Sequence, residues 1–208
     1  MPTLLNIQSS RRYDTSVSRI LSNQFIEQWQ KSNPGGKVIT RDLAKTELPF
    51  ISLTWISAAF IPNEKRTPEM VEALKLSDEL VAEFISADQL LMGVPMHNFN
   101  VTADFKAYID QVVRFNHTYN MDGGMLADKP TTAIIASGRF YTPDSPEQQC
   151  NHVSGFLKCV LGYMGIKSVQ FVLAGGARAV NLGQETLDNH IKKYQSAIIA
   201  AADHQQHL

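Results

Sequence analysis

Side chains that carry hydroxyl groups gather near the amino terminus, in the segment Ser9–Ser18. Besides its two terminal serines, this segment contains Ser10, Thr15 and Ser16, and an apolar stripe typical of a helix begins just after it. The first turn of a helix has unpaired N–H groups and a partial positive charge, which together bind phosphate well. Hydroxyl donors would complete such a site. The alternative interpretation is simple capping of the helix by Thr15 or Ser16.

Three arginines make the same neighbourhood basic, namely Arg11, Arg12 and Arg19. The segment lacks the Gly-x-Gly-x-x-Gly fingerprint, which excludes a dinucleotide site of the Rossmann type there. It also lacks Gly-Lys-Ser/Thr, so it is not a nucleotide-triphosphate loop. Because no acidic residue ends the third predicted strand, a phosphoacceptor receiver is not supported either.

A second segment, Pro95–Asn100, reads Pro-Met-His-Asn-Phe-Asn. The apolar run 89–94 before it predicts a buried strand, and Pro95 ends that strand by removing a backbone donor. Apolar residues at three- and four-residue steps after Val101 predict a helix. Loops at the carboxyl ends of strands bind ligands in open α/β sheets, and this loop offers soft, flat and hydrogen-bonding side chains. It suits a planar heterocycle. The alternative is an ordinary connector with Asn98 or Asn100 as N-cap of the helix.

A phosphate site and a heterocycle site, without a dinucleotide fingerprint, together indicate FMN. A third polar loop, 137–144, follows a further predicted strand. Cys150 and His152 are too few for a metal site, which needs three or four convergent ligands, so no metal is expected.

Five strands alternating with helices predict an α/β fold, a doubly wound five-stranded parallel sheet with helices on both faces, in one domain over residues 1–208. The predicted strands are 4–8, 37–41, 89–94, 131–136 and 168–173. The helices are expected at 20–29, 54–60, 67–85, after Phe99, over 153–164 and over roughly 183–202, with Thr67 as N-cap of the third.

Composition narrows the function classes. Nineteen basic and 20 acidic residues nearly cancel, so no field attracts nucleic acid or a membrane surface. No apolar run approaches the ~20 residues of a membrane span, and no signal peptide is recognised at the start. The two cysteines match no disulfide or metal spacing, and we expect reduced thiols in a cytoplasmic protein.

Four motifs together resemble the bacterial FMN-dependent NADH azoreductases, also called FMN-dependent NADH:quinone oxidoreductases. They are Ser9-Ser10-x5-Ser16-Val17-Ser18, Thr67-Pro68, Leu76-Ser77-Asp78-Glu79-Leu80 and Pro95-Met96-His97-Asn98-Phe99-Asn100. The likeness covers essentially the whole chain. It implies a flavodoxin-like fold, a homodimer with FMN at the interface, NADH as co-substrate, and a quinone or azo compound as the small-molecule acceptor. A single exposed flavin face that serves both substrates in turn predicts ping-pong kinetics.

The resemblance also assigns site residues. It implies that Ser10, Ser16, Val17 and Ser18 bind the FMN phosphate, that Met96, His97, Asn98 and Phe99 line the isoalloxazine, and that Ser137, Gly138, Arg139 and Phe140 meet its pyrimidine side. The Gly138 backbone and the Arg139 side chain are candidate donors to the charge of the reduced ring. His97 is the candidate catalytic residue, as a proton donor to the reduced acceptor, with packing beside the ring as the alternative.

The chain departs from the family pattern at three places. His97 stands where Tyr is usual, residues 137–140 read Ser-Gly-Arg-Phe instead of Ser-Arg-Gly-Gly, and the loop 115–126 is shorter, with Tyr119 near a common Phe position. The apolar segment 53–61 could cover the core, form the dimer contact or roof the partner's flavin, and Trp55 and Phe60 are the aromatic residues expected near the acceptor. Two other functions stay open: a flavodoxin-type electron carrier, which the near-neutral charge disfavours, and a flavin-free regulatory protein that has kept the fold.

Overall fold

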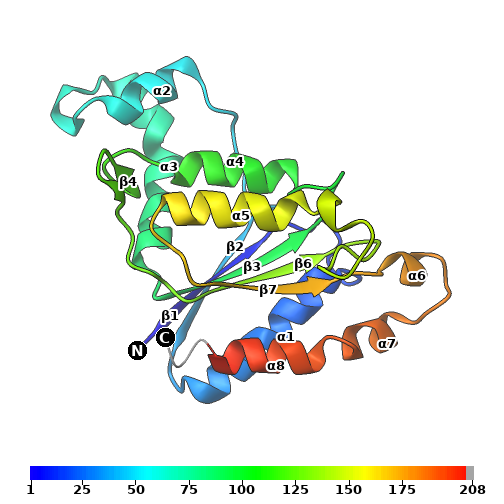
Figure 1. Cartoon of the computed structure of the whole chain (residues 1–208). Coiled ribbons are helices and arrows are strands. Elements are labelled where there is room, and N and C mark those ends of the chain that lie inside the picture. The colour runs from blue at the N-terminus through cyan, green and yellow to red at the C-terminus, as the bar shows by residue number, and fades with distance from the viewer. Residues whose placement is uncertain (205–208) are drawn as a thin grey trace.

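The computed structural model describes residues 1–204, and its centre is a parallel five-stranded sheet in the order β2-β1-β3-β6-β7 (Figure 1). The strands are β1 (Thr3–Gln8), β2 (Lys37–Asp42), β3 (Gln89–Pro95), β6 (Thr131–Ala136) and β7 (Val169–Ala174). The chain moves outward from β1 in both directions, which places a topological switch point between β1 and β3. Ligands of doubly wound proteins bind in the crevice at the carboxyl ends of the strands at such a point. The predicted doubly wound, five-stranded parallel sheet is confirmed.

Helices cover both faces of the sheet. The helices are α1 (Val17–Ser32), α2 (Leu53–Phe60), α3 (Pro68–Ser86), α4 (Ala103–Val112), α5 (His152–Tyr163), α6 (Arg178–Asn181), α7 (Leu187–Lys192) and α8 (Gln195–His204), with 3-10 turns at Asn63–Lys65 and Gln148–Cys150. One core cluster joins the sheet to α3, α4 and α5, and a second joins it to α1, α7 and α8. Figure 1 shows α4 and α5 above the sheet and α1 and α8 below it.

Adjacent strand residues face opposite layers. Leu4 and Leu91 are buried on the α1 side, whereas Leu5 and Leu90 are buried on the α3 to α5 side. Side chains of a strand alternate between faces, so a sheet covered on both sides needs apolar residues at successive positions. This explains why the strands read as continuous apolar runs in the sequence.

Helix starts follow the capping signals in the sequence. Thr67 caps α3 by accepting a hydrogen bond from the Met70 N–H, and Pro68 occupies the first turn, as predicted. The cap of α4 is Thr102, whose hydroxyl accepts from the Phe105 N–H, so the alternative that Asn98 or Asn100 caps this helix is wrong. The segment 98–100 is used instead for a tight turn.

The single long helix predicted over residues 183–202 is wrong. Gly183 has a left-handed φ of +67° and separates α6 from the following segment. Lys193 and Tyr194 then bond three residues back, to the His190 and Ile191 carbonyls, which interrupts the α-helical ladder between α7 and α8. The Tyr194 hydroxyl meanwhile donates to the Gly175 carbonyl at 2.6 Å, so a tertiary contact fixes the break.

A small two-stranded hairpin, β4 (Tyr119–Asn120) with β5 (Gly123–Gly124), lies within the loop before β6 and was not predicted. Its carboxyl end packs closely on the end of α5, since a Cβ on Gly124 would lie 2.2 Å from the Gly165 nitrogen. None of the helices in residues 1–204 combines the length and apolar character that a membrane crossing requires.

Candidate functional site

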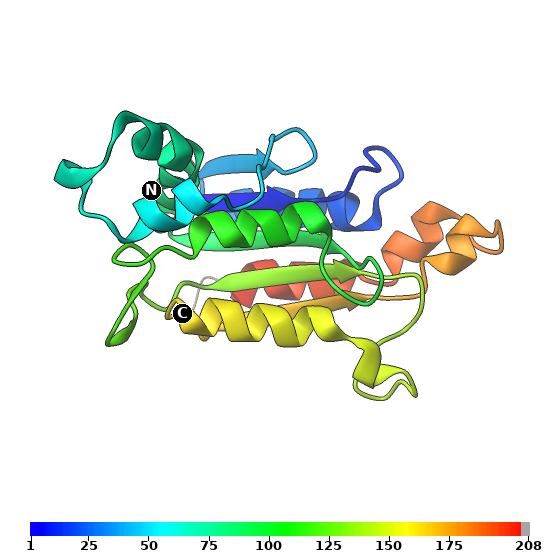
Figure 2. The same cartoon turned by 90° about the horizontal axis from the view of Figure 1, so that it is seen from above.

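A pocket of about 430 Å³ opens at the carboxyl ends of β1, β3 and β6. Figure 2 shows the loops that follow these strands gathered at one end of the molecule together with α6, while α2 lies at the opposite end. The lining residues come from four segments: Ser10, Arg11, Arg12, Thr15, Ser16, Val17 and Ser18; Pro95, Met96 and His97; Ala136, Ser137 and Gly138; and Ala177, Val180, Asn181 and Leu187. The pocket therefore occupies the switch point that the sheet order defines.

Three buried hydroxyls mark the end of the pocket nearest α1. Ser10, Ser16 and Ser18 are 5%, 4% and 0% exposed, and the Ser16 and Ser18 oxygens lie 3.2 Å apart. Ser16 is also the N-cap of α1, accepting from the Arg19 N–H at 3.4 Å, so the capping interpretation of this residue is confirmed. Capping does not use all the hydrogen-bond donors of this segment, because the N–H groups of Val17 and Ser18 have no partner within the described part of the chain.

The hydroxyl-rich segment Ser9–Ser18 is held in place by contacts with Arg19. The Arg19 guanidinium donates to the Ser10 carbonyl at 2.9 and 2.6 Å and to the Asp42 carboxylate at 2.6 Å. Tyr13 lies beneath the same guanidinium, whose carbon is 4.8 Å from the ring centroid. An arginine fixed by a carboxylate at the end of β2 thus orients the carbonyl of Ser10 away from the pocket.

The loop after β3 forms a second wall. His97 and Asn100 exchange two backbone hydrogen bonds of 2.9 and 3.0 Å, which closes a tight turn. Its central residues, Asn98 and Phe99, have left-handed φ values of 47° and 69°, the geometry of a type I′ turn. Met96, just before the turn, bonds from its N–H to the Ala136 carbonyl at 2.7 Å, which ties this wall to the end of β6.

The predicted ring-binding loop contributes two of its four residues to the lining. Met96 and His97 line the pocket, whereas Asn98 and Phe99 project from the turn beyond it. Phe99 is 49% exposed and meets the Tyr141 ring edge-on at a centroid distance of 6.3 Å. The contact of Phe99 is therefore with the loop after β6.

The third predicted segment, residues 137–140, also contributes only some of its residues to the lining of the pocket. Ser137 and Gly138 line the pocket, and Ser137 is fixed by a hydrogen bond from its hydroxyl to the Arg139 carbonyl at 2.8 Å. The Arg139 side chain pairs with Glu147 and the Phe140 ring packs against Gly176, so neither lines the pocket. The Arg139 side chain pairs with a neighbouring carboxylate at the surface, and its expected bond to the ligand stays a prediction.

Sequence reasoning missed the wall formed by α6 and the start of α7. Ala177, Val180, Asn181 and Leu187 line the pocket, yet no element was predicted over 177–181, and Leu187 was placed within one continuous helix over 183–202. The available signal was the pair of breakers Gly176 and Gly183, both left-handed, which bracket α6.

Trp55 and Phe60 lie on α2 and do not line the pocket of their own chain, so their expected place near the acceptor, under the roof that α2 could form over a partner's flavin, stays a prediction. Trp55 is buried and donates from its ring nitrogen to Gln111 at 2.9 Å, so it packs α2 onto α4. Phe60 is 60% exposed and contacts the Phe115 ring.

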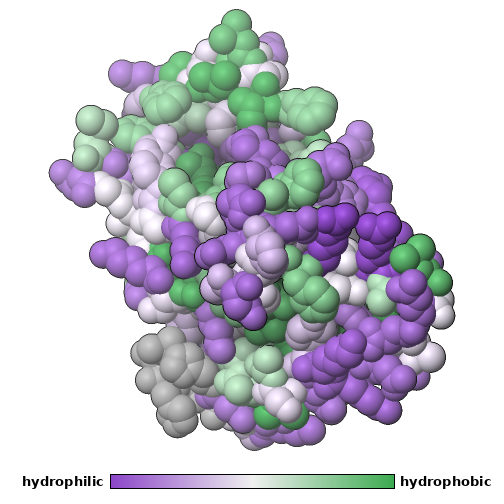
Figure 3. Space-filling view, turned by 45° about the vertical axis from the view of Figure 1, so that its right-hand side comes forward, coloured by the Kyte–Doolittle hydropathy of each residue, from purple (hydrophilic) through white to green (hydrophobic). Residues whose placement is uncertain are grey.

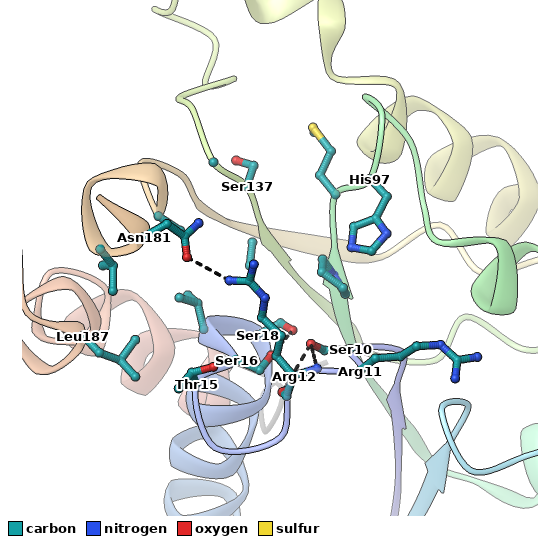
Figure 4. A pocket seen from close by; sticks show the side chains of 17 residues that line it. Ser10, Arg11, Arg12, Thr15, Ser16, Ser18, His97, Ser137, Asn181 and Leu187 are labelled. Atoms are coloured by element: carbon teal, nitrogen blue, oxygen red, sulfur yellow. Dashed lines mark hydrogen bonds between the residues drawn. The ribbon is translucent and has the colours of Figure 1, made fainter. Parts of the chain in front are cut away.

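The chemistry of the lining fits FMN. At one end, hydroxyls, free amides and the Arg12 guanidinium provide donors, and the described lining includes no carboxylate that would repel a phosphate. Figure 4 shows Ser10, Ser16 and Ser18 on one side of the pocket and His97 and Ser137 across from them. Apart from His97 and Asn181, the remaining wall consists of small or apolar residues, as expected for a flat heterocycle. Among residues 1–204, no cluster of His, Cys, Asp or Glu could hold a metal ion.

Comparisons with known proteins agree with this geometry. Residues 2–198 match the family model described as flavodoxin-like fold. An FMN-dependent NADH:quinone oxidoreductase from Burkholderia lata is 41% identical over 97% of both chains. Another, from Jannaschia sp., is 42% identical over 97% of this chain and all of its own.

Solved structures confirm the fold. A Bacillus anthracis azoreductase superposes with a TM-score of 0.85 at 23% identity, covering 97% of this chain and 99% of its own. An FMN-dependent NADH-azoreductase from the same species, in complex with FMN, has a TM-score of 0.84 at 24% identity over 98% and 99% of the two chains. The chain belongs to the flavodoxin-like fold family and, within it, to the FMN-dependent NADH:quinone oxidoreductases.

Proposed function

We propose that this protein is an FMN-dependent oxidoreductase that oxidises NADH and reduces quinones or azo compounds. The observation that carries the proposal is the pocket at the β1–β3 switch point, where buried hydroxyls and free helix amides face an apolar wall. The relatives at 41% and 42% identity are named for this activity, not for electron carriage between proteins. The carrier alternative therefore has no support from the named relatives.

The phosphate of FMN would bind at the α1 end of the pocket. Ser10, Ser16 and Ser18 would donate from their hydroxyls, and the N–H groups of Val17 and Ser18 would complete the shell. Bonds to a charged group are stronger than bonds between neutral groups, which favours this use of otherwise unpaired donors.

The isoalloxazine would lie against Met96 and His97, with Ser137 and Gly138 at its pyrimidine side. Asn98 and Phe99 directly follow Met96 and His97 and would lie at the rim of the same ring site. Arg139 and Phe140 directly follow Ser137 and Gly138, and they would belong to the site through this main-chain connection. When bound, FMN would take a hydride from NADH and then pass two electrons to the quinone or azo compound. The residues of this chain hold the ring and leave one face open to both substrates in turn, which predicts ping-pong kinetics.

His97 is exposed beside the pocket, so solvent can resupply a proton to its ring. We assign to it the proton transfer to the reduced acceptor, since an imidazole ring can both donate and accept a proton. His97→Phe should leave reduction by NADH intact and slow the acceptor half-reaction in stopped-flow measurements. If the variant kept the wild-type rate in both half-reactions, His97 would have only a packing role.

One assay tests the proposed function. Purified protein reconstituted with FMN should be yellow, oxidise NADH with menadione or methyl red, and show parallel double-reciprocal lines as the second substrate is varied. Without an acceptor, NADH oxidation should be slow. A yellow protein that stabilises a semiquinone and ignores NADH would instead be a carrier, and a chain that FMN fails to saturate would be neither.

We also propose a homodimer with the site at its interface, in the cytoplasm. Figure 3 shows apolar residues gathered at the α2 end of the molecule. Phe50, Leu53 and Phe60 there are 88%, 79% and 60% exposed, which is unusual for a monomer surface. Both cysteines carry free thiols, as expected of a reducing compartment. Sedimentation equilibrium should give twice the chain mass, and Leu53→Glu should shift the protein to the monomer.

A further inference from the structure

Three arginines surround the hydroxyl segment, but they differ in how their charges are balanced. Arg11 donates to the Asp104 carboxylate at 3.1 and 2.7 Å and points away from the pocket (Figure 4). Arg19 pairs with Asp42 at 2.6 Å. Arg12 has no carboxylate partner among residues 1–204, and its one side-chain bond is to the neutral Asn181 amide oxygen at 2.8 Å. Its positive charge is therefore the unbalanced one of the three.

Arg12 stands directly at the phosphate end of the pocket. Its backbone nitrogen lies 3.2 Å from the Ser10 hydroxyl oxygen, so its main chain adjoins the buried hydroxyls. In Figure 4 the side chain rises beside Ser16 and Ser18 and reaches across to Asn181 on α6. A guanidinium carries five N–H donors, and the bond to Asn181 uses one of them. The remaining donors are available at the site where a phosphate would bind.

Resting on the function proposed above, we propose that Arg12 binds the phosphate of FMN and makes the site select FMN over riboflavin. The hydroxyls and amides bind a phosphate through hydrogen bonds and the partial charge of the helix end, and none of them carries a full charge. A guanidinium adds a full charge and can bond two phosphate oxygens at once. Riboflavin has the same ring and ribityl chain without the phosphate, and it gains nothing from this charge.

Asn181 has a defined part in this arrangement. An exposed arginine samples many rotamers, and holding it in one costs conformational entropy. The amide oxygen of Asn181 restrains the guanidinium above the pocket without neutralising it, whereas an aspartate at the same place would cancel the charge. The partner of Arg12 thus keeps its charge available to an anionic ligand.

The test is a fluorescence titration of the full-length apoprotein with FMN and, separately, with riboflavin. Arg12→Gln should weaken FMN binding about tenfold, the lower end for a charge-assisted bond at an exposed site. Riboflavin binding should change less than about twofold, and Arg12→Lys should recover part of the loss, because lysine keeps the charge without the planar fork. The control is Arg178→Gln, which removes an equal charge from α6 at a residue that does not line the pocket. It should leave the ratio of the two dissociation constants unchanged.

Each other outcome has a defined meaning. If the wild type binds FMN and Arg12→Gln retains the wild-type ratio, the role of Arg12 is refuted while the proposed function stands. Equal losses for FMN and riboflavin would show that Arg12 shapes the pocket instead of binding phosphate, and an equal effect of Arg178→Gln would show a long-range charge effect; both overturn the inference. A wild type that binds neither flavin would refute the proposed function itself.

Discussion

Replacing Ser18 by alanine should separate ligand binding from folding stability. Ser18 is fully buried on the first turn of α1, and within the described part of the chain its hydroxyl has a single partner, the Ser16 oxygen 3.2 Å away. If the hydroxyl exists to bind a phosphate, its removal should weaken FMN binding much more than it weakens the fold. If it serves packing alone, the order should be reversed.

The expected changes in binding and in stability follow from the partners of the Ser18 hydroxyl. A hydrogen bond to a charged group contributes about 1.5–3 kcal/mol, so Ser18→Ala should raise the dissociation constant for FMN roughly 10- to 150-fold. The lost bond to Ser16 joins two neutral groups and contributes about 0.5–1.5 kcal/mol, part of which is offset by the better helix propensity of alanine. The free energy of unfolding of the apoprotein should therefore fall by no more than about 1 kcal/mol.

Ser22 supplies the matched control. It lies one turn further along α1, is equally buried and does not line the pocket, and its hydroxyl has no hydrogen-bond partner among residues 1–204. Ser22→Ala should leave FMN binding unchanged and raise the free energy of unfolding by about 1 kcal/mol, because an unpaired buried hydroxyl is removed. Urea denaturation and flavin titration measure both quantities. Equal FMN affinity in Ser18→Ala and the wild type would refute the assignment of this hydroxyl to the phosphate site.

Two further predictions concern stability. Gly124→Ala should destabilise the protein by more than about 2 kcal/mol in urea denaturation, since the new Cβ would lie 2.2 Å from the Gly165 nitrogen, whereas Gly162→Ala, with no atom within 4 Å, should stabilise α5 by about 0.5–1 kcal/mol. Similar effects of the two would contradict the packing described for the β4–β5 hairpin. Hydrogen bonds from the Ser168 backbone and hydroxyl lower the pKa of Asp128, so this carboxylate favours the folded state at neutral pH and loses that contribution as the pH falls below about 4. Asp128→Ala should accordingly show a smaller loss of stability between pH 7 and pH 3 than the wild type; an unchanged pH profile would count against it.

The parts of the fold that follow from local rules were predictable. The strands run through apolar segments that face two layers, and Thr67-Pro68 specifies the start of α3 by cap and ring geometry together. The break between α7 and α8 was not predictable in the same way, because the Tyr194 hydroxyl makes its contact with Gly175, nineteen residues earlier in the chain. Periodicity cannot report a contact between distant residues.

The same distinction applies to the site. The serines of the first loop could be identified from the sequence by their type and position, and the structure places Ser10, Ser16 and Ser18 together in one pocket. The side chain of Arg139 could not be placed from sequence, because its direction depends on Glu147, an acidic residue in an irregular loop. Arg11 and Arg12 are neighbours of the same type, and only their partners, Asp104 and Asn181, show which one keeps an unbalanced charge.

The turn at 97–100 shows how tertiary contacts impose a conformation that local preference opposes. Asparagine tolerates a left-handed backbone, but a phenylalanine at φ 69° costs roughly 1–3 kcal/mol. Two contacts offset this cost: the His152 N–H at the start of α5 donates to the Phe99 carbonyl at 3.2 Å, and the Phe99 ring meets Tyr141. Both partners come from the loop and helix that follow β6. The wall formed by Met96 and His97 is therefore held against the wall formed by Ser137 and Gly138, and the width of the pocket between them depends on this turn.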